Sequence, residues 1–163
     1  MLRLMPDRTP TDYSLLIPEM RDWNDGKGIN IEGWLNYAGN YKLAIGFSSL
    51  FWPEFAEHDQ CVLYAPVNIE SYNHWMEACK GDRRAVEAVK NHRHMLDLFH
   101  QDSANATAAR LIHIGRVLKD ILSVKLGHDF PNRTFEVAFD EGPFENLVDY
   151  QVTFWQPANE PKP

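Results

Sequence analysis

The 163-residue chain has the length of a single domain, and its 44% hydrophobic and 12% aromatic content is that of a folded protein, which excludes wholesale disorder. The two cysteines, Cys61 and Cys79, lack the paired spacing of a metal or redox motif, and no apolar run is long enough to cross a bilayer. We therefore expect a cytoplasmic protein without cofactors, folded as one domain over residues 1–156 with a flexible tail at 157–163.

Charge is distributed unevenly along the sequence, whose net charge is −7. Residues 1–79 contain five Lys/Arg against eleven Asp/Glu, residues 80–133 contain ten against six, and residues 134–163 contain one against six. The middle of the chain is thus basic and both flanks are acidic, which predicts a basic helical layer behind an acidic sheet. The acidic total opposes binding to nucleic acid and favours a basic protein as partner.

The first 30 residues predict an irregular arm, because five prolines and glycines interrupt them. Asn30 is placed to cap a short helix that contains Ile31 and Leu35. From Tyr41 to Phe47, large apolar residues alternate with small or polar ones, which is the period of a half-buried strand.

Residues 61–65 form a short apolar run followed by a proline, which predicts a second strand. Two helices are expected after it. The first covers residues 68–81 and the second residues 82–99, with Glu87 and Arg93 on the water-facing side of the second.

The strongest helical pattern spans residues 103–126, where polar residues recur every three or four positions around a wide apolar arc. Ser103 can cap the start of this helix, and Gly127 followed by Pro131 can end it. So broad an apolar arc predicts a buried helix at the centre of the fold.

Alternation returns over residues 135–139 and 148–155, and the Asp-Glu-Gly-Pro sequence at 140–143 has the composition of a turn. These segments predict a hairpin. Together the elements predict an α+β fold, in which a mostly antiparallel sheet of about four strands is covered on one face by about three helices, including the long helix 103–126.

The leading functional hypothesis is a non-catalytic domain that binds another protein with a basic surface, in the manner of an inhibitor or a toxin-neutralising, immunity-like protein. It depends on aromatic side chains flanked by carboxylates along the predicted hairpin, because charge accelerates encounter and buried aromatics supply affinity. The residues of this acidic face are Glu136, Asp140, Glu141, Glu145, Asp149, Tyr150 and Trp155.

The alternative hypothesis is a small-ligand-binding protein or an enzyme with a pocket near residues 51–59, joined by the histidines of residues 92–100. Carboxylates stand beside an imidazole in this aromatic segment, but no nucleophile motif accompanies them, which favours a protein that is not an enzyme. The candidate pocket residues are Phe51, Trp52, Glu54, Glu57 and His58.

Three residues of the second predicted helix, His94, Asp97 and His100, have the spacing at which neighbouring side chains on a helix can approach one metal ion. No HExxH or comparable signature accompanies them, and on a helix the first and last lie about 120° apart. We therefore expect a solvated helix end here rather than a metal site.

Overall fold

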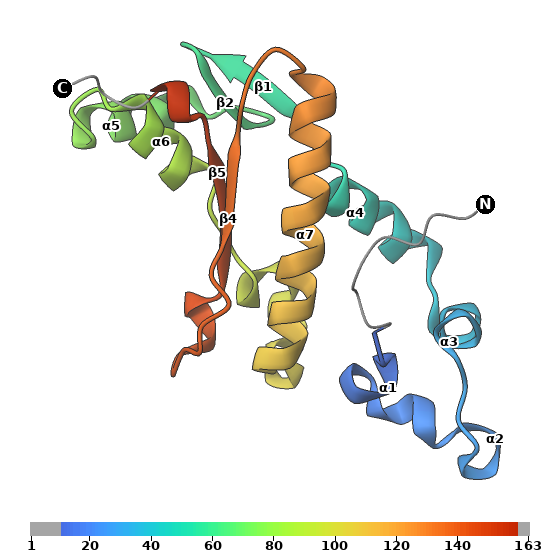
Figure 1. Cartoon of the computed structure of the whole chain (residues 1–163). Coiled ribbons are helices and arrows are strands. Elements are labelled where there is room, and N and C mark those ends of the chain that lie inside the picture. The colour runs from blue at the N-terminus through green and yellow to red at the C-terminus, as the bar shows by residue number, and fades with distance from the viewer. Residues whose placement is uncertain (1–10, 160–163) are drawn as a thin grey trace. The chain divides into compact units, whose positions relative to one another are not determined.

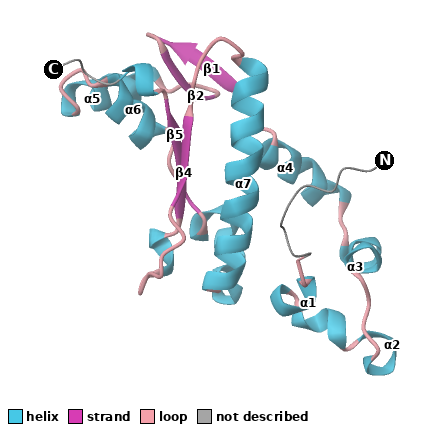
Figure 2. Cartoon of the chain, in the orientation of Figure 1, coloured by secondary structure: helices cyan, strands magenta, loops and turns pink. Residues whose placement is uncertain are grey.

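The structure is a computed structural model that describes residues 11–159 (Figure 1). It is a mixed α+β structure with two small antiparallel sheets in the described chain (Figure 2). The chain divides into two units, which separate between Ala44 and Ile45. This boundary lies beyond residue 30, where the sequence predicts that the N-terminal arm ends.

Helices and strands follow one another in an irregular order. The α-helices are α1 (Tyr13–Leu16), α2 (Trp23–Gly26), α3 (Ile31–Ala38), α4 (Tyr41–Phe51), α5 (Ile69–Ala78), α6 (Arg83–Lys90) and α7 (Ala108–Asp129). The strands are β1 (Phe55–His58), β2 (Cys61–Tyr64), β3 (Arg93–His94), β4 (Glu136–Phe139) and β5 (Gln151–Trp155). Short 3-10 helices cover Pro18–Arg21, Leu96–Asn105, Leu147–Asp149 and Pro157–Asn159.

The first unit contains three aromatic rings that pack on one another. The ring centroids of Trp23 and Tyr37 lie 4.3 Å apart, and that of Trp34 lies 6.4 Å from each of them. The side chain of Asn30 accepts a hydrogen bond from the backbone N–H of Gly33 at 2.8 Å, as a residue that caps a helix does. The predicted short helix after Asn30 is therefore confirmed, as α3.

The segment Tyr41–Phe47, predicted as a strand, is instead the first part of helix α4. The side chain of Asn40 accepts hydrogen bonds from the backbone N–H groups of Lys42 at 2.9 Å and Leu43 at 3.3 Å, which stabilises the start of a helix. A helix that is apolar on opposite sides also shows apolar residues at every second position. The alternation of apolar residues in the sequence therefore could not distinguish a half-buried strand from this helix.

A two-stranded hairpin, β1 and β2, follows α4. Its turn consists of Asp59 and Gln60, which both have positive φ angles, 47° and 68°, as a two-residue hairpin turn requires. Strand β2 confirms the strand predicted at residues 61–65. Strand β1 lies within the segment 51–59, for which the sequence predicted no strand.

The second sheet has the strand order β3-β5-β4, and β4 and β5 form the predicted hairpin. Helices lie on both faces of this sheet, not on one face as predicted (Figure 1). Val152 and Phe154 pack with leucines of α7, whereas the hydroxyl of Thr153 donates to the carbonyl of Ala88 in α6 at 2.6 Å. The expected sheet of about four strands is instead two smaller sheets. The expected strand Tyr41–Phe47 is helical, β2 pairs with β1, and β5 pairs with β3 and β4.

Helix α7 confirms the predicted central helix but begins later in the chain. The hydroxyl of Thr107, rather than that of Ser103, accepts a hydrogen bond from the backbone N–H of Arg110 at 3.3 Å. The ring of Phe139 packs against Gly115 in the middle of the helix. A Cβ atom at residue 115 would lie 2.2 Å from that ring, so the close approach of β4 to α7 requires glycine there.

Helix α6 ends at Lys90, although the sequence predicted a helix that continued to residue 99. The side chain of Asn91 is fully buried, and its Nδ2 donates to the carbonyl oxygens of Val62 at 2.9 Å and Phe154 at 3.3 Å. These bonds join β2 to β5. The chain leaves the helix at Asn91 because the side chain binds two strands that lie far from it in the sequence.

Glu87, one helical turn before Asn91, was predicted to face water but is completely buried. Its carboxylate accepts hydrogen bonds from the backbone N–H groups of Val62 and Gln156, each at 2.8 Å. It also accepts bonds from the side chains of Gln156 at 2.6 Å and Asn159 at 3.2 Å. Glu87 is buried because these four donors replace the water that a carboxylate otherwise needs.

Candidate functional site

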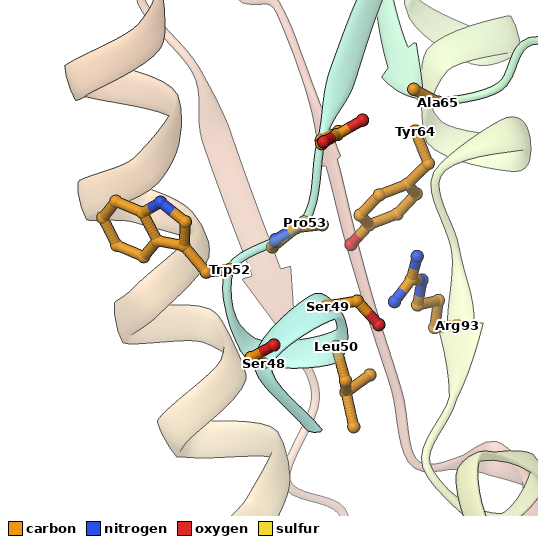
Figure 3. A pocket seen from close by; sticks show the side chains of 9 residues that line it. Ser48, Ser49, Leu50, Trp52, Pro53, Tyr64, Ala65 and Arg93 are labelled. Carbon is orange, nitrogen blue, oxygen red and sulfur yellow. The ribbon is translucent and has the colours of Figure 1, made fainter. Parts of the chain in front are cut away.

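A cavity of about 600 Å³ opens beside the C-terminal end of α4, within the second unit (Figure 3). We call it the Arg93 pocket. Helix α4, the loop that leads to β1, the end of β2 and strand β3 contribute its walls. The residues that line it are Ser48, Ser49, Leu50, Trp52, Pro53, Glu54, Tyr64, Ala65 and Arg93. Its size lies within the range of small-molecule sites.

The guanidinium of Arg93 lies over an aromatic ring in this pocket. Its central carbon is 3.7 Å from the centroid of the Tyr64 ring, and Figure 3 shows the two side chains facing each other. Burial raises the pKa of Tyr64 to about 12, while the positive charge of Arg93 opposes the rise. The phenol is therefore neutral at physiological pH, and its ring holds the cation in place by a cation–π contact.

Arg93 has no carboxylate within ion-pair distance among residues 11–159. Since no hydrogen bond or ion pair within residues 11–159 engages the N–H groups of its guanidinium, they are available to a ligand. Glu54, in the loop before β1, likewise has no cationic partner in the described part of the protein. The pocket therefore carries one positive and one negative group, neither neutralised by another side chain.

Two serine hydroxyls line the same pocket. The hydroxyl of Ser48 donates to the carbonyl of Ile45 at 2.7 Å, and that of Ser49 donates to the carbonyl of Gly46 at 2.8 Å. Since their protons are engaged by the helix, the serine oxygens are left as hydrogen-bond acceptors. Ser49 points toward Arg93, whereas Trp52 points away from it toward α7 (Figure 3).

The pocket expected near residues 51–59 is partly formed. Trp52 and Glu54 line the cavity, but the other three candidates do not. Phe51 packs against the apolar core, and Glu57 forms a salt bridge with Arg133 at 2.6 Å. His58 lies at the far end of the hairpin, where its ring centroid is 4.7 Å from that of Tyr72.

None of the histidines of residues 92–100 lines the Arg93 pocket. Arg93, which lies between His92 and His94 in the sequence, does line it. The Nδ1 atom of His94 donates to the carbonyl of Val148 at 2.7 Å, which leaves Nε2 as the ring nitrogen that could bind a metal. Asp97 and His100 are exposed on the following 3-10 helix. Within residues 11–159, no three His, Cys, Asp or Glu side chains lie close enough together to hold a metal ion.

The two aromatic members of the predicted acidic face are buried or partly covered by other side chains. Tyr150 is only 2% exposed and packs edge-on against Phe144. Trp155 lies beneath the guanidinium of Arg84, 5.2 Å from it, and its ring nitrogen is buried. The alternation of residues in the hairpin indicated which side chains share a face of the strand. It did not indicate that α7 covers one face and α6 the other.

The carboxylates of that face have two environments. Glu141 forms a two-pronged salt bridge with Arg116, whose hydrogen bonds lower the pKa of this carboxyl. The other four are exposed and have no ion-pair partner among the described residues. These four are Glu136, Asp140, Glu145 and Asp149.

The basic middle of the chain and its acidic flanks do not form separate layers. Arg116 pairs with Glu141, Arg83 with Asp59, and Arg133 with Glu57, so three salt bridges each join a cation of the middle to an acid of a flank. The predicted segregation of charge is therefore wrong. The reason is that helices α6 and α7 pack directly against the acidic hairpins, which brings opposite charges together.

Arg83 and Asp59 belong to a second polar cluster, at the turn of the β1–β2 hairpin. The guanidinium of Arg83 donates to both carboxylate oxygens of Asp59 at 3.0 Å, and the hydroxyl of Tyr72 donates to one of them at 3.2 Å. Arg83 also donates to the backbone carbonyl of Asp59 at 3.0 Å. All of these bonds hold a residue with positive φ, so the cluster stabilises the turn.

Exposed apolar side chains are concentrated on α4 and on the residue that follows it. Tyr41 is 91% exposed and Ile45 is 72% exposed, and Leu43, Phe47 and Trp52 are also exposed. Within the second unit, the ring of Phe47 contacts that of Phe99, with centroids 5.6 Å apart. Alternation in the sequence identified these residues as apolar, but because it predicted a half-buried strand it did not reveal their exposure.

Comparison with protein-family models, with curated proteins and with solved structures finds no match to this chain. None of the helices within residues 11–159 combines the length and the apolar character that crossing a bilayer requires. A functional conclusion therefore depends on the geometry of α4 and of the Arg93 pocket.

Proposed function

We propose that the protein is a non-catalytic domain that binds another protein through helix α4. One observation carries the proposal: α4 is rich in large apolar side chains, with Lys42 as its one charged residue, and most of these side chains are exposed. Exposed apolar clusters on proteins mark surfaces that a partner covers. The proposal retains the expected binding role and a cytoplasmic location, but moves the binding surface from the acidic hairpin to α4.

The arrangement of side chains around α4 supports this role. Leu43 and Phe47 lie one turn apart, and Phe47 contacts Phe99 in the body of the second unit. Tyr41 and Ile45 also lie one turn apart, on the opposite side of the helix. A helix that is apolar on opposite sides is normally buried all round, so the Ile45 side lacks the cover that its composition favours.

The partner that fits is a protein with an apolar groove and a basic rim. Helices commonly bind by placing apolar side chains one turn apart into such a groove, and Tyr41 with Ile45 has that spacing. The net charge of −7 favours a basic partner, because opposite charge accelerates encounter. An inhibitor or toxin-neutralising protein acts through binding of this kind.

Site-specific photo-crosslinking tests the proposal. A photoreactive amino acid at position 45 is compared with the same amino acid at position 124, because Val124 is 64% exposed but lies on α7. We expect a protein to be crosslinked from position 45 and not from position 124. With that protein purified, Ile45→Asp should weaken binding at least about tenfold, while Val124→Asp should leave it unchanged.

Salt and self-association complete the test. Binding of the purified partner should weaken as salt concentration rises, since salt screens the carboxylates. Crosslinking that is equal at both positions, or binding that Ile45→Asp leaves unchanged, would contradict the proposal. Sedimentation velocity distinguishes a further outcome: a dimer of this chain that Ile45→Asp dissociates would mean that α4 binds a second copy and not another protein.

A further inference from the structure

We propose that the Arg93 pocket binds a small zwitterion of the amino-acid type, with its carboxylate on Arg93 and its ammonium group near Glu54. This inference goes beyond the protein-binding role and uses different residues of the second unit. It is derived from the charges, the hydrogen-bond acceptors and the apolar wall of the pocket.

Arg93 is arranged to bind a carboxylate. It contacts the Tyr64 ring at 3.7 Å, and it forms no ion pair with an acidic side chain of the described residues. Two parallel N–H groups on the edge of a guanidinium match the two oxygens of a carboxylate. A side chain already held by a ring loses little conformational freedom when the ligand binds, which favours affinity.

The acceptors of the pocket suit an ammonium group. Glu54 supplies a carboxylate without a cationic partner among residues 11–159, and Ser48 and Ser49 supply oxygens whose own protons are donated to the helix. An ammonium carries three donors and no acceptor, so it matches these groups. A ligand that offered only acceptors would leave them without partners.

The balance of charge selects among anions. The lining contains one cation, Arg93, and one anion, Glu54, so its formal charge is zero. A phosphate brings nearly two negative charges and would be repelled by Glu54, whereas a zwitterion brings one charge of each sign. The charge pattern therefore favours an amino acid over a phosphate.

An apolar wall completes the pocket. Leu50 and the buried Pro53 line it, and so does part of Trp52, whose ring points toward α7 (Figure 3). Such a wall accommodates a hydrocarbon side chain, because removing apolar surface from water is favourable. Amino acids with aliphatic side chains are the expected ligands.

Ligand-observed NMR with the full-length protein tests the inference. The probes are leucine, 4-methylpentanoate, which lacks the amine, 3-methylbutylamine, which lacks the carboxylate, and inorganic phosphate. Leucine should give a saturable signal, and each of the other probes should bind at least about tenfold more weakly. Binding of phosphate alone, or equal binding of leucine and its two analogues, would overturn the inference, as would no binding by any probe.

Variants assign the binding to this pocket. Arg93→Gln should abolish the leucine signal, and Glu54→Gln should weaken it about tenfold. Arg84→Gln is the matched control, because Arg84 also lies over an aromatic ring, that of Trp155, but outside the pocket. Circular dichroism checks that each variant is folded. If Arg93→Gln does not fold, Glu54→Gln still tests the pocket, because it alters an exposed side chain. An equal loss in Arg84→Gln would contradict the assignment.

Discussion

Glu87 accepts two hydrogen bonds from Gln156, one from the backbone N–H at 2.8 Å and one from the side-chain Nε2 at 2.6 Å. The same carboxylate accepts a bond from the backbone N–H of Val62. A single buried side chain of α6 therefore fixes the beginning of β2 and the end of β5. No backbone ladder joins those two strands, so Glu87 and Asn91 supply hydrogen bonds that neighbouring strands in one sheet would exchange directly.

We predict that Glu87→Ala destabilises the protein by roughly 3 kcal/mol, because it leaves several buried donors without an acceptor. Glu87→Gln should cost less, about 1–2 kcal/mol, since one oxygen still accepts. Urea unfolding followed by circular dichroism measures both values. Glu136→Ala, at an exposed position of β4, is the control and should be close to neutral. A neutral Glu87→Ala would mean that these hydrogen bonds do not hold the two strands.

The contact between Gly115 and Phe139 gives a second prediction. A Cβ at residue 115 would lie 2.2 Å from the Phe139 ring, so Gly115→Ala should destabilise the protein by about 1–3 kcal/mol. Gly127 lies on the same helix, and no atom lies within 4 Å of the position that a Cβ would take at this residue. Gly127→Ala should therefore stabilise the protein by about 0.5–1 kcal/mol. The opposite signs are measured by thermal or urea unfolding. Equal effects at the two positions would show that β4 does not approach α7 this closely.

Part of the fold was predictable from local sequence. The central helix, the β4–β5 hairpin and the helix after Asn68 each carry a clear period, and the structure has all three, although the central helix is capped by Thr107 and continues past Gly127 to Asp129. Local patterns of this kind are enough when neighbours in the sequence determine the structure.

The errors arise where distant residues decide. Arg93 was predicted on the water-facing side of a helix because Asp82 opens a good helical pattern. The helix ends early because Asn91 binds Val62 and Phe154, and this places Arg93 in a strand opposite Tyr64. A local pattern contains no information on such contacts, so the pocket could be anticipated only through Trp52 and Glu54.

The two cysteines should differ in reactivity. Cys61 is completely buried beside the hydroxyl of Tyr72, and burial raises the pKa of its thiol to about 11. Since the thiolate is the reactive form, Cys61 should resist Ellman's reagent near pH 8 in the folded protein, while the partly exposed Cys79 reacts. In Cys79→Ser the remaining thiol should react only after urea is added. Modification of Cys61 without urea, at a rate like that of Cys79, would contradict its burial.

Stability in alkali should depend on Tyr64. Its pKa is raised by burial from an ordinary value of about 10 to about 12 in the folded protein, and Arg93 limits the rise. Between these values the folded protein keeps a proton that the unfolded chain has lost, so the free energy of unfolding should fall as the pH rises from about 10 to about 12. Tyr64→Phe should reduce this slope, and Tyr41→Phe, at a side chain that is 91% exposed, is the control. Tyr72, whose pKa is also raised by burial, should retain part of the slope. Urea unfolding at a series of pH values measures it, and an unchanged slope in Tyr64→Phe would mean that the ring beneath Arg93 is open to solvent.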